Sequence, residues 1–266
     1  MSNWLGLDDR VILVTGGASG IGKATAESIK EGGATVVIAD MNVQTGDEID
    51  GMWCVHCNVT DPDEVKAMVD AIVEKYGHID GLFNNAGINK PCLLVDVRGD
   101  HPEYELDVKK FDQLFGVNVK GLFLVAQAVA KQMLKQGKGG VIVNTSSASG
   151  KEGSEGQSPY SATKGACDSF TRSWAKELGR YGIRVVAVAP DIMDATALRS
   201  EAYDKALAYT RGTVPEKMNT DYSKSVPLGR PGHLYEVGDL VAFLMSDHAG
   251  YITGTTINVS GGKSRG

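Results

Sequence analysis

The sequence predicts a single α/β domain, built as a doubly wound parallel sheet flanked by helices. Three observations predict it: short apolar runs alternate with longer helical patterns, the runs are apolar on both faces, and a glycine-rich turn follows the first run. The 266 residues suffice for one sizeable core, and no repeat, low-complexity segment or linker divides them. We therefore expect one domain over residues 1–266.

Near-continuous apolar runs are expected to be strands, because the strands of a parallel sheet are covered by helices on both faces. An alternating run that ends at Cys54–Cys57 supplies the third strand of the chain. The other expected strands are Arg10–Thr15, Thr35–Ala39, Ile79–Phe83, Gly140–Asn144 and Arg184–Ala189.

Helical patterns separate these runs. Asp61 before Pro62 suits a helix N-cap followed by proline in the first turn. Right-handed crossovers then place ligands at the carboxyl ends of the strands. The expected helices include Gly22–Glu31, Pro62–Tyr76, Phe111–Lys135 and Pro159–Tyr181.

Two irregular stretches follow strands at this ligand-binding edge, at about residues 89–107 and 191–227. Long loops in such a position are usually functional, so we predict that they bind substrate. Alternatively, the two stretches are surface loops that have no role in binding.

Composition excludes some functions. The net charge of −6 argues against nucleic acid as a partner, although a small anionic substrate needs only a local basic pocket. The first residues lack the pattern of a signal peptide, and no apolar stretch approaches the ~20 residues of a membrane helix. The cysteines at 54 and 57 have a metal-like spacing without a second Cys/His pair nearby, which favours a structural role and no metal. We expect a reduced, cytoplasmic protein.

A glycine-rich turn, Thr15–Gly22, directly follows the first strand and opens a helix. Glycines let the backbone approach a pyrophosphate, and the helix N-terminus offers free N–H groups. This context predicts a Rossmann-type dinucleotide site. The candidate cofactor-binding residues in it are Gly16, Ser19, Gly20, Ile21 and Gly22.

Asp40 ends the second strand, 18 residues after Gly22. A carboxylate there can accept hydrogen bonds from the adenosine ribose hydroxyls and would repel a 2′-phosphate. Position 41 carries no Lys or Arg. The predicted cofactor is therefore NAD rather than NADP.

Tyr160 and Lys164 lie four residues apart at the start of an expected helix, so they share one face. A free tyrosine titrates near pH ~10, too high for a base at neutral pH, but a neighbouring cation favours the phenolate. The pair therefore suits general acid/base work.

Together these motifs resemble the short-chain dehydrogenase/reductase family over nearly the whole chain. The resemblance rests on the turn at 15–22, Asn84–Gly87, Asn118, Ser146–Ser147 and the Tyr160/Lys164 pair, in this order. It implies that Tyr160 removes the proton from the substrate hydroxyl, that Ser147 fixes the reacting oxygen, and that Lys164 binds the nicotinamide ribose. Asn118 would hold a water linked to Lys164.

The resemblance also implies further cofactor contacts. Asn58 and Val59 would frame the adenine, Asn85 and Gly87 would support the ribose side, and Pro190 to Met193 would flank the nicotinamide. Asp191 departs from the family, which usually has glycine after this proline, and its carboxylate either affects nicotinamide binding or faces solvent.

A narrower resemblance is to the family's bacterial sorbitol-6-phosphate 2-dehydrogenases, which use NAD. It rests on segments such as 93–96, 152–158, 171–178 and 208–211. Glu152, Glu155 and Gln157 are candidate hydroxyl ligands, although surface turn residues explain them as well. Cys92 replaces a frequent Arg, which suggests a moved phosphate contact or an unphosphorylated polyol. The candidate phosphate ligands are Lys90, Lys151, Arg199 and Arg211.

Alternatives of other kinds stay open. They are a reductase of the family for a free polyol, a steroid or an acyl thioester, and a non-catalytic NAD-binding regulator, which would be expected to lose one of Ser147, Tyr160 and Lys164. The resemblance implies a homotetramer assembled through helices 111–135 and 159–181. Burial of these helices within one subunit fits the pattern nearly as well.

Overall fold

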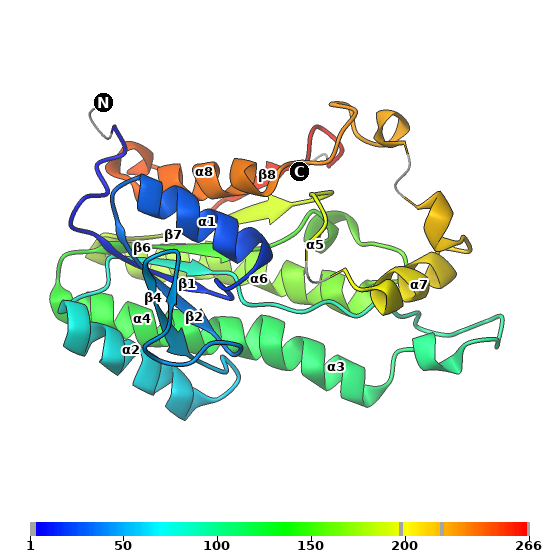
Figure 1. Cartoon of the computed structure of the whole chain (residues 1–266), viewed down its shortest axis with the longest axis horizontal. Coiled ribbons are helices and arrows are strands. Elements are labelled where there is room, and N and C mark those ends of the chain that lie inside the picture. Colours follow the sequence, from blue (N-terminus) through cyan, green and yellow to red (C-terminus); the bar gives the residue numbers. More distant parts are fainter. Residues whose placement is uncertain (1–3, 197–198, 219–220, 265–266) are drawn as a thin grey trace.

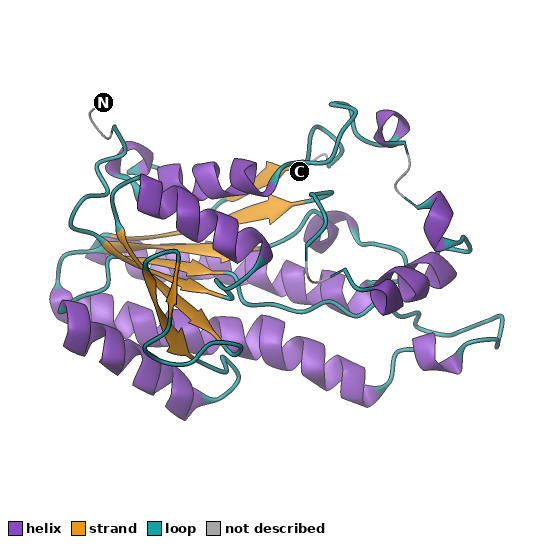
Figure 2. Cartoon of the chain, viewed as in Figure 1, coloured by secondary structure: helices purple, strands orange, loops and turns teal. Residues whose placement is uncertain are grey.

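The computed structural model describes residues 4–196, 199–218 and 221–264. It confirms the predicted single-domain α/β fold: a sheet lies between two layers of helices (Figures 1 and 2). The described strands are β1 (Val11–Thr15), β2 (Thr35–Asp40), β3 (Glu48–Ile49), β4 (Met52–His56), β5 (Gly81–Asn84), β6 (Gly140–Thr145), β7 (Ile183–Pro190) and β8 (Thr256–Val259).

The strand order is β3-β4-β2-β1-β5-β6-β7-β8, and all neighbours pair in parallel except the antiparallel β3 and β4. The chain winds outward from β1 in both directions, first through β2 and then through β5. A crevice therefore opens between the carboxyl ends of β1 and β5, where doubly wound sheets bind ligands.

Helices cover both faces of the sheet, as the apolar strands require. α1 and α8 lie together on one face, and α2, α4 and α6 cover the other (Figure 1). The described helices are α1 (Gly20–Glu31), α2 (Pro62–Tyr76), α3 (Val108–Phe115), α4 (Leu122–Gln136), α5 (Ser149–Glu152), α6 (Ser158–Leu178), α7 (Glu201–Thr210) and α8 (Leu234–Met245).

The alternation of side chains along β1 divides the core into two parts. Ile12 and Val14 belong to the cluster under α1 and α8, whereas Val11 and Leu13 belong to the cluster under α2 and α4. All four are almost completely buried. Successive residues of a strand point to opposite faces, so one apolar strand contributes to both layers.

Several predicted boundaries differ from the structure. The helix expected at 111–135 begins at Val108 and is interrupted by a π-helical segment, Gly116–Gly121, between α3 and α4. α6 ends at Leu178, and one 3₁₀ turn continues to Tyr181. α1 begins at Gly20 rather than Gly22, and β5 begins at Gly81 rather than Ile79. The shifted ends are differences of end geometry, whereas the π-helical segment is an interruption that the sequence pattern did not predict.

One prediction about membranes needs correction. Among the described residues, the helical stretch Val108–Gln136 is long and apolar enough to cross a bilayer by length and composition, although no such stretch was expected. It is weak evidence for a membrane, because the core helices of globular proteins pass the same test. Its apolar side chains include Val125 and Val129, which are fully buried against the sheet.

Candidate active site

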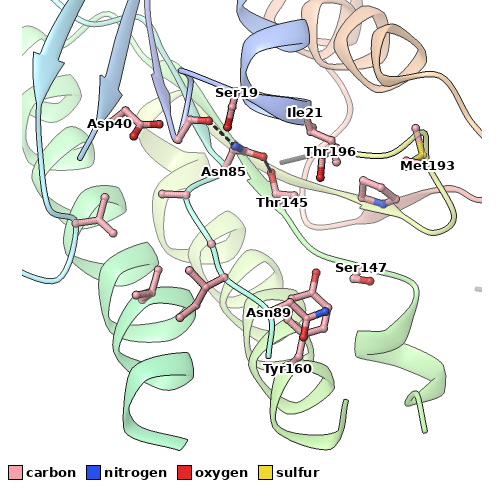
Figure 3. Close-up of a pocket in the computed structure, with 18 of the residues that line it drawn as sticks. Ser19, Ile21, Asp40, Asn85, Asn89, Thr145, Ser147, Tyr160, Met193 and Thr196 are labelled. Atoms are coloured by element: carbon pink, nitrogen blue, oxygen red, sulfur yellow. Dashed lines mark hydrogen bonds between the residues drawn. The ribbon is translucent and has the colours of Figure 1, made fainter. Parts of the chain in front are cut away.

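A cleft of about 430 Å³ lies at the carboxyl ends of the strands (Figure 3). This volume is typical of small-molecule sites. Most of the predicted site residues line it: Gly16, Ser19, Gly20, Ile21, Asp40, Asn58, Val59, Asn85, Gly87, Ser147, Tyr160, Lys164, Pro190, Met193 and Arg199. These residues come from segments far apart in the chain, and the fold brings them to one cleft.

The glycine-rich turn has a backbone conformation that depends on glycine. Gly16 and Gly20 have φ of +64° and +56°, a region that side chains other than glycine rarely adopt. Ser19 is the N-cap of α1, yet its hydroxyl makes no capping hydrogen bond within the described chain. The first N–H groups of the helix and the Ser19 hydroxyl thus suit an anion.

Gly22 has a different role from the predicted one. It does not line the cleft, and a Cβ there would lie 2.0 Å from the carbonyl oxygen of Gly16. Only glycine lets α1 pack this closely against the turn. Gly22 therefore shapes the site from behind, as the third glycine of such turns does.

Asp40 lies at the end of β2 with its carboxylate facing the turn. Oδ2 accepts the Ala18 amide at 3.3 Å, and Oδ1 accepts the backbone and side-chain N–H groups of Asn42 at 3.0 and 3.1 Å. The residue is 9% exposed. A carboxylate accepts about four hydrogen bonds, so Asp40 keeps acceptor capacity toward the cleft.

Asn85 joins three strand ends beneath the cleft. Its Nδ2 donates to the carbonyl oxygens of Thr15 and Gly16, both at 3.2 Å, and its Oδ1 accepts the Thr145 hydroxyl at 3.3 Å (Figure 3). These contacts fix β1, β5 and β6 relative to one another. Asn85 therefore packs the central strands together at the base of the cleft.

Tyr160 and Lys164 lie on one side of α6 and line the cleft together. The Lys164 Nζ lies 5.6 Å from the centroid of the Tyr160 ring and donates to the Thr145 carbonyl at 2.6 Å. Lys164 is 5% exposed. The buried ammonium is therefore held at a fixed place beside the phenol.

Asn118 lies in the π-helical segment and is buried beneath the cleft rather than in it. Its Oδ1 accepts the Ile88 N–H and its Nδ2 donates to the Ile88 carbonyl, both at 2.9 Å. A Cβ at Gly87 would lie 3.3 Å from the Asn118 Oδ1 and 3.8 Å from the Lys164 Nζ. The glycine therefore keeps the strand end, the amide and the ammonium close together. π-Helical turns are frequent at functional sites.

Ser147 follows β6 and lines the cleft with Tyr160 (Figure 3). Its Oγ accepts the backbone N–H of Ser149 at 3.3 Å and lies 3.0 Å from the Ser149 hydroxyl. The backbone contact orients the Ser147 side chain. Its hydroxyl and the phenol of Tyr160 are the two groups that could hold one reacting oxygen.

Several predicted substrate ligands lie elsewhere. Glu152 and Glu155 are exposed, and neither lines the cleft. Gln157 is buried behind the cleft. Three of the four candidate cations also lie outside it, where they bond to protein groups: Lys90 to Gln113, Lys151 to Asn258 and Arg211 to Ser154. Arg199 does line the cleft and pairs with Asp204 at 2.7 Å.

The structure adds residues that sequence reasoning missed. Asn89, Asp194, Thr196 and Tyr203 line the cleft and come from the two irregular stretches. The stretches were predicted to bind substrate, but nothing in their patterns distinguished these side chains from their neighbours. Asn89 and Tyr203 are brought together by a contact between the two stretches, which no local pattern reveals.

The cysteines are free and buried, in keeping with the structural role predicted for Cys54 and Cys57. Burial raises the pKa of Cys57, which lines the cleft, to about 12, so its thiol is a poor nucleophile. In residues 4–196, 199–218 and 221–264, no three His, Cys, Asp or Glu side chains gather as metal ligands.

Comparisons with known proteins agree with this geometry. A family model described as enoyl-(acyl carrier protein) reductase matches residues 16–264. The chain is 50% identical over 271 residues to sorbitol-6-phosphate 2-dehydrogenase of Klebsiella pneumoniae, with all of both chains covered.

Solved structures also resemble the chain. An NAD⁺-bound xylitol dehydrogenase has a TM-score of 0.84 and 31% identity, over 97% of this chain and 100% of that one. A 3-ketoacyl-(acyl-carrier-protein) reductase of Brucella melitensis, complexed with NADH, has a TM-score of 0.81 and 30% identity, over 97% and 100%. The protein therefore belongs to the short-chain dehydrogenase/reductase family and is an oxidoreductase acting on alcohol groups.

Proposed function

We propose that this protein is an NAD-dependent dehydrogenase that interconverts sorbitol 6-phosphate and fructose 6-phosphate. The observation that carries the proposal is the 50% identity, over the full length of both chains, to the Klebsiella enzyme of that name. The reaction class rests on Tyr160, Lys164 and Ser147, which line one cleft.

The residues present fit a dinucleotide. The turn at Gly16–Gly20 and the open N-terminus of α1 would hold the pyrophosphate, and Asn58 and Val59 the adenine. Asp40 would accept the adenosine ribose hydroxyls and repel a 2′-phosphate, which favours NAD. Pro190 and Met193 would flank the nicotinamide. When bound, NAD accepts or returns the hydride.

We assign the proton transfer of this reaction to side chains of the protein. Tyr160 would take the proton of the substrate hydroxyl during oxidation, and the ammonium of Lys164 stabilises the phenolate. Ser147 would donate a hydrogen bond to the reacting oxygen and fix it beside Tyr160. Asn118 positions the Ile88 backbone and, with a bound water, would connect Lys164 to solvent.

A phosphate group would need a cation in the cleft. Among the described residues that line it, Lys164 and Arg199 carry positive charge, and Lys164 serves Tyr160. Arg199 is tied to Asp204 by its Nε at 3.0 Å and its Nη2 at 2.7 Å, and about a third of the Arg199 side chain is exposed. A guanidinium in this position could contact Asp204 and a phosphate together.

The direct test compares sorbitol 6-phosphate with sorbitol at equal concentration, following NADH formation from NAD⁺. We expect the phosphate ester to be strongly preferred, and an Arg199→Met variant to lose most of that preference. Lys90→Met is the matched control, because Lys90 bonds Gln113 outside the cleft. Preference for sorbitol would favour a free-polyol dehydrogenase, the second candidate, which the likeness to xylitol dehydrogenase supports. If neither compound is oxidised, both substrate proposals fail and only the family assignment stands.

The non-catalytic regulator is the least favoured alternative, because Ser147, Tyr160 and Lys164 are all present and line the cleft. We propose a cytoplasmic homotetramer assembled through α3, α4 and α6. Phe111, Phe123 and Leu134 support this assembly, since more than a third of each large apolar side chain is exposed along α3 and α4. Light scattering in solution gives the subunit number directly.

A further inference from the structure

Tyr203 of α7 is held by two side-chain amides at the wall of the cleft. Its hydroxyl oxygen accepts the Gln157 Nε2 at 2.8 Å and the Asn89 Nδ2 at 3.2 Å. Asn89 follows β5, Gln157 precedes α6, and Tyr203 comes from the second irregular stretch. Three segments far apart in the sequence thus meet at one phenol.

Because the Tyr203 oxygen already accepts two N–H donors, its hydroxyl proton is the group that remains available for a further hydrogen bond. A hydroxyl offers two acceptor lone pairs and one proton, and the two amides use both lone pairs. The proton of Tyr203 must therefore point away from Asn89 and Gln157. Burial, together with the nearby Tyr160, raises the pKa of Tyr203 to about 12, so the phenol keeps its proton at neutral pH. Tyr203 is a hydrogen-bond donor that lacks an acceptor in these contacts.

Asn89 supplies the complementary group. Its Oδ1 is buried and has no hydrogen-bond partner among the described residues, although its Nδ2 is bonded. Buried polar atoms without partners are rare and costly. Asn89 and Tyr203 both line the cleft that Tyr160 lines, so the unpartnered acceptor and the unpartnered donor belong to residues of one cleft. Figure 3 shows Asn89 beside Tyr160.

We propose that Asn89 and Tyr203 together bind a hydroxyl group on the carbon next to the one that reacts at Tyr160. A hydroxyl both donates and accepts, so it satisfies the Asn89 Oδ1 and the Tyr203 proton at once. The ligand class is a vicinal diol, as in a polyol. This inference rests on the proposed function. The contacts of Asn89 and Tyr203 with the second hydroxyl would distinguish a polyol from a simple secondary alcohol.

Gln157 acts through Tyr203 and is a positioning residue. Its Oε1 accepts the Ser154 hydroxyl at 2.8 Å, and that hydroxyl oxygen accepts the Arg211 guanidinium at 3.2 Å. Gln157 is 8% exposed, and it forms a β-bridge with Cys92. Two residues predicted as direct substrate ligands, Gln157 and Arg211, thus support the ligand site from behind.

The test compares butane-2,3-diol with butan-2-ol, which differ by one hydroxyl on the neighbouring carbon. We expect the wild-type protein to prefer the diol in kcat/KM, and Tyr203→Phe to reduce this preference about tenfold or more. Tyr209→Phe is the matched control, because Tyr209 lies on the same helix but donates to Asp96 at 2.9 Å, outside the cleft. It should keep the wild-type preference. Gln157→Leu should raise KM for the diol more than it lowers kcat.

NADH binding and thermal unfolding, measured on each variant, confirm that it is folded. No preference of the wild type for the diol, or an unchanged preference in Tyr203→Phe, would overturn the inference. The inference and the proposed function can nevertheless fail separately. If sorbitol 6-phosphate is a substrate but the preference survives in Tyr203→Phe, the function stands and the inference falls. If the preference is lost in Tyr203→Phe but sorbitol 6-phosphate is not a substrate, the inference stands and the proposed function falls.

Discussion

Lys263, near the end of the chain, forms an ion pair with Asp191, the residue that follows β7. Its Nζ lies 3.2 Å from the Asp191 Oδ1 and 3.1 Å from its Oδ2. The Asp191 side chain is only 15% exposed, and its residue lines the cleft. The aspartate that replaces the family's usual glycine therefore has a cationic partner from the C-terminal tail.

Replacing Lys263 with methionine should leave this largely buried carboxylate without its cationic partner. We expect a loss of about 1 kcal/mol in the free energy of unfolding, because the lysine is partly exposed, and a several-fold weaker binding of NADH. Urea unfolding and NADH titration measure the two effects. Combining Asp191→Gly with Lys263→Met forms a double-mutant cycle. Additive effects in the cycle would show that the pair does not act as a unit.

Asp40→Ala should relax the choice of cofactor. Removal of the carboxylate removes acceptors for the adenosine ribose and the repulsion of a 2′-phosphate. The ratio of kcat/KM for NAD⁺ to that for NADP⁺ should fall about tenfold or more. Asp194→Asn serves as control, since its carboxylate lies in the same cleft but pairs with His233 at 2.9 Å. An unchanged ratio in Asp40→Ala would remove Asp40 from the cofactor site.

Gly156→Ala should destabilise the protein and damage the polyol site. Gly156 has φ of +74°, and a Cβ there would lie 2.0 Å from the Thr210 Oγ1 on α7. We expect a loss of about 2 to 4 kcal/mol in the free energy of unfolding from the strained backbone and the overlap. Gly153→Ala separates the two causes, because Gly153 has φ of +73° but open space around it. Equal losses for both variants would mean that the contact with Thr210 is unimportant.

Patterns local in sequence predicted the fold and most of the candidate site residues that line the cleft. Apolar runs identified β1, β2, β6 and β7, since buried parallel strands need apolar side chains on both faces. The glycine turn, Asp40 and Ser147 each lie at or just after the end of such a run, so the topology brings them to one edge. Tyr160 lies in the first turn of α6 and lines the same cleft. β8 and α8 were not identified, although both are regular elements of the structure.

The substrate side depends on contacts that no local pattern contains. Tyr203 contacts Asn89 across 114 residues and Gln157 across 46, and Lys263 contacts Asp191 across 72. Whether a polar loop residue points into a cleft depends on how two irregular stretches pack. That is why Glu152 and Glu155 were predicted as ligands and found exposed, whereas Asn89 and Tyr203 were missed.

The most direct test of the account is Tyr160→Phe, which removes one hydroxyl and keeps the ring beside Lys164. We predict that turnover of the best alcohol substrate falls about a thousandfold, within the range for loss of a general acid/base group, while NADH binds within about twofold of wild type. A variant that binds NADH normally but keeps more than about a tenth of wild-type turnover would contradict the assignment of Tyr160 as the catalytic acid/base.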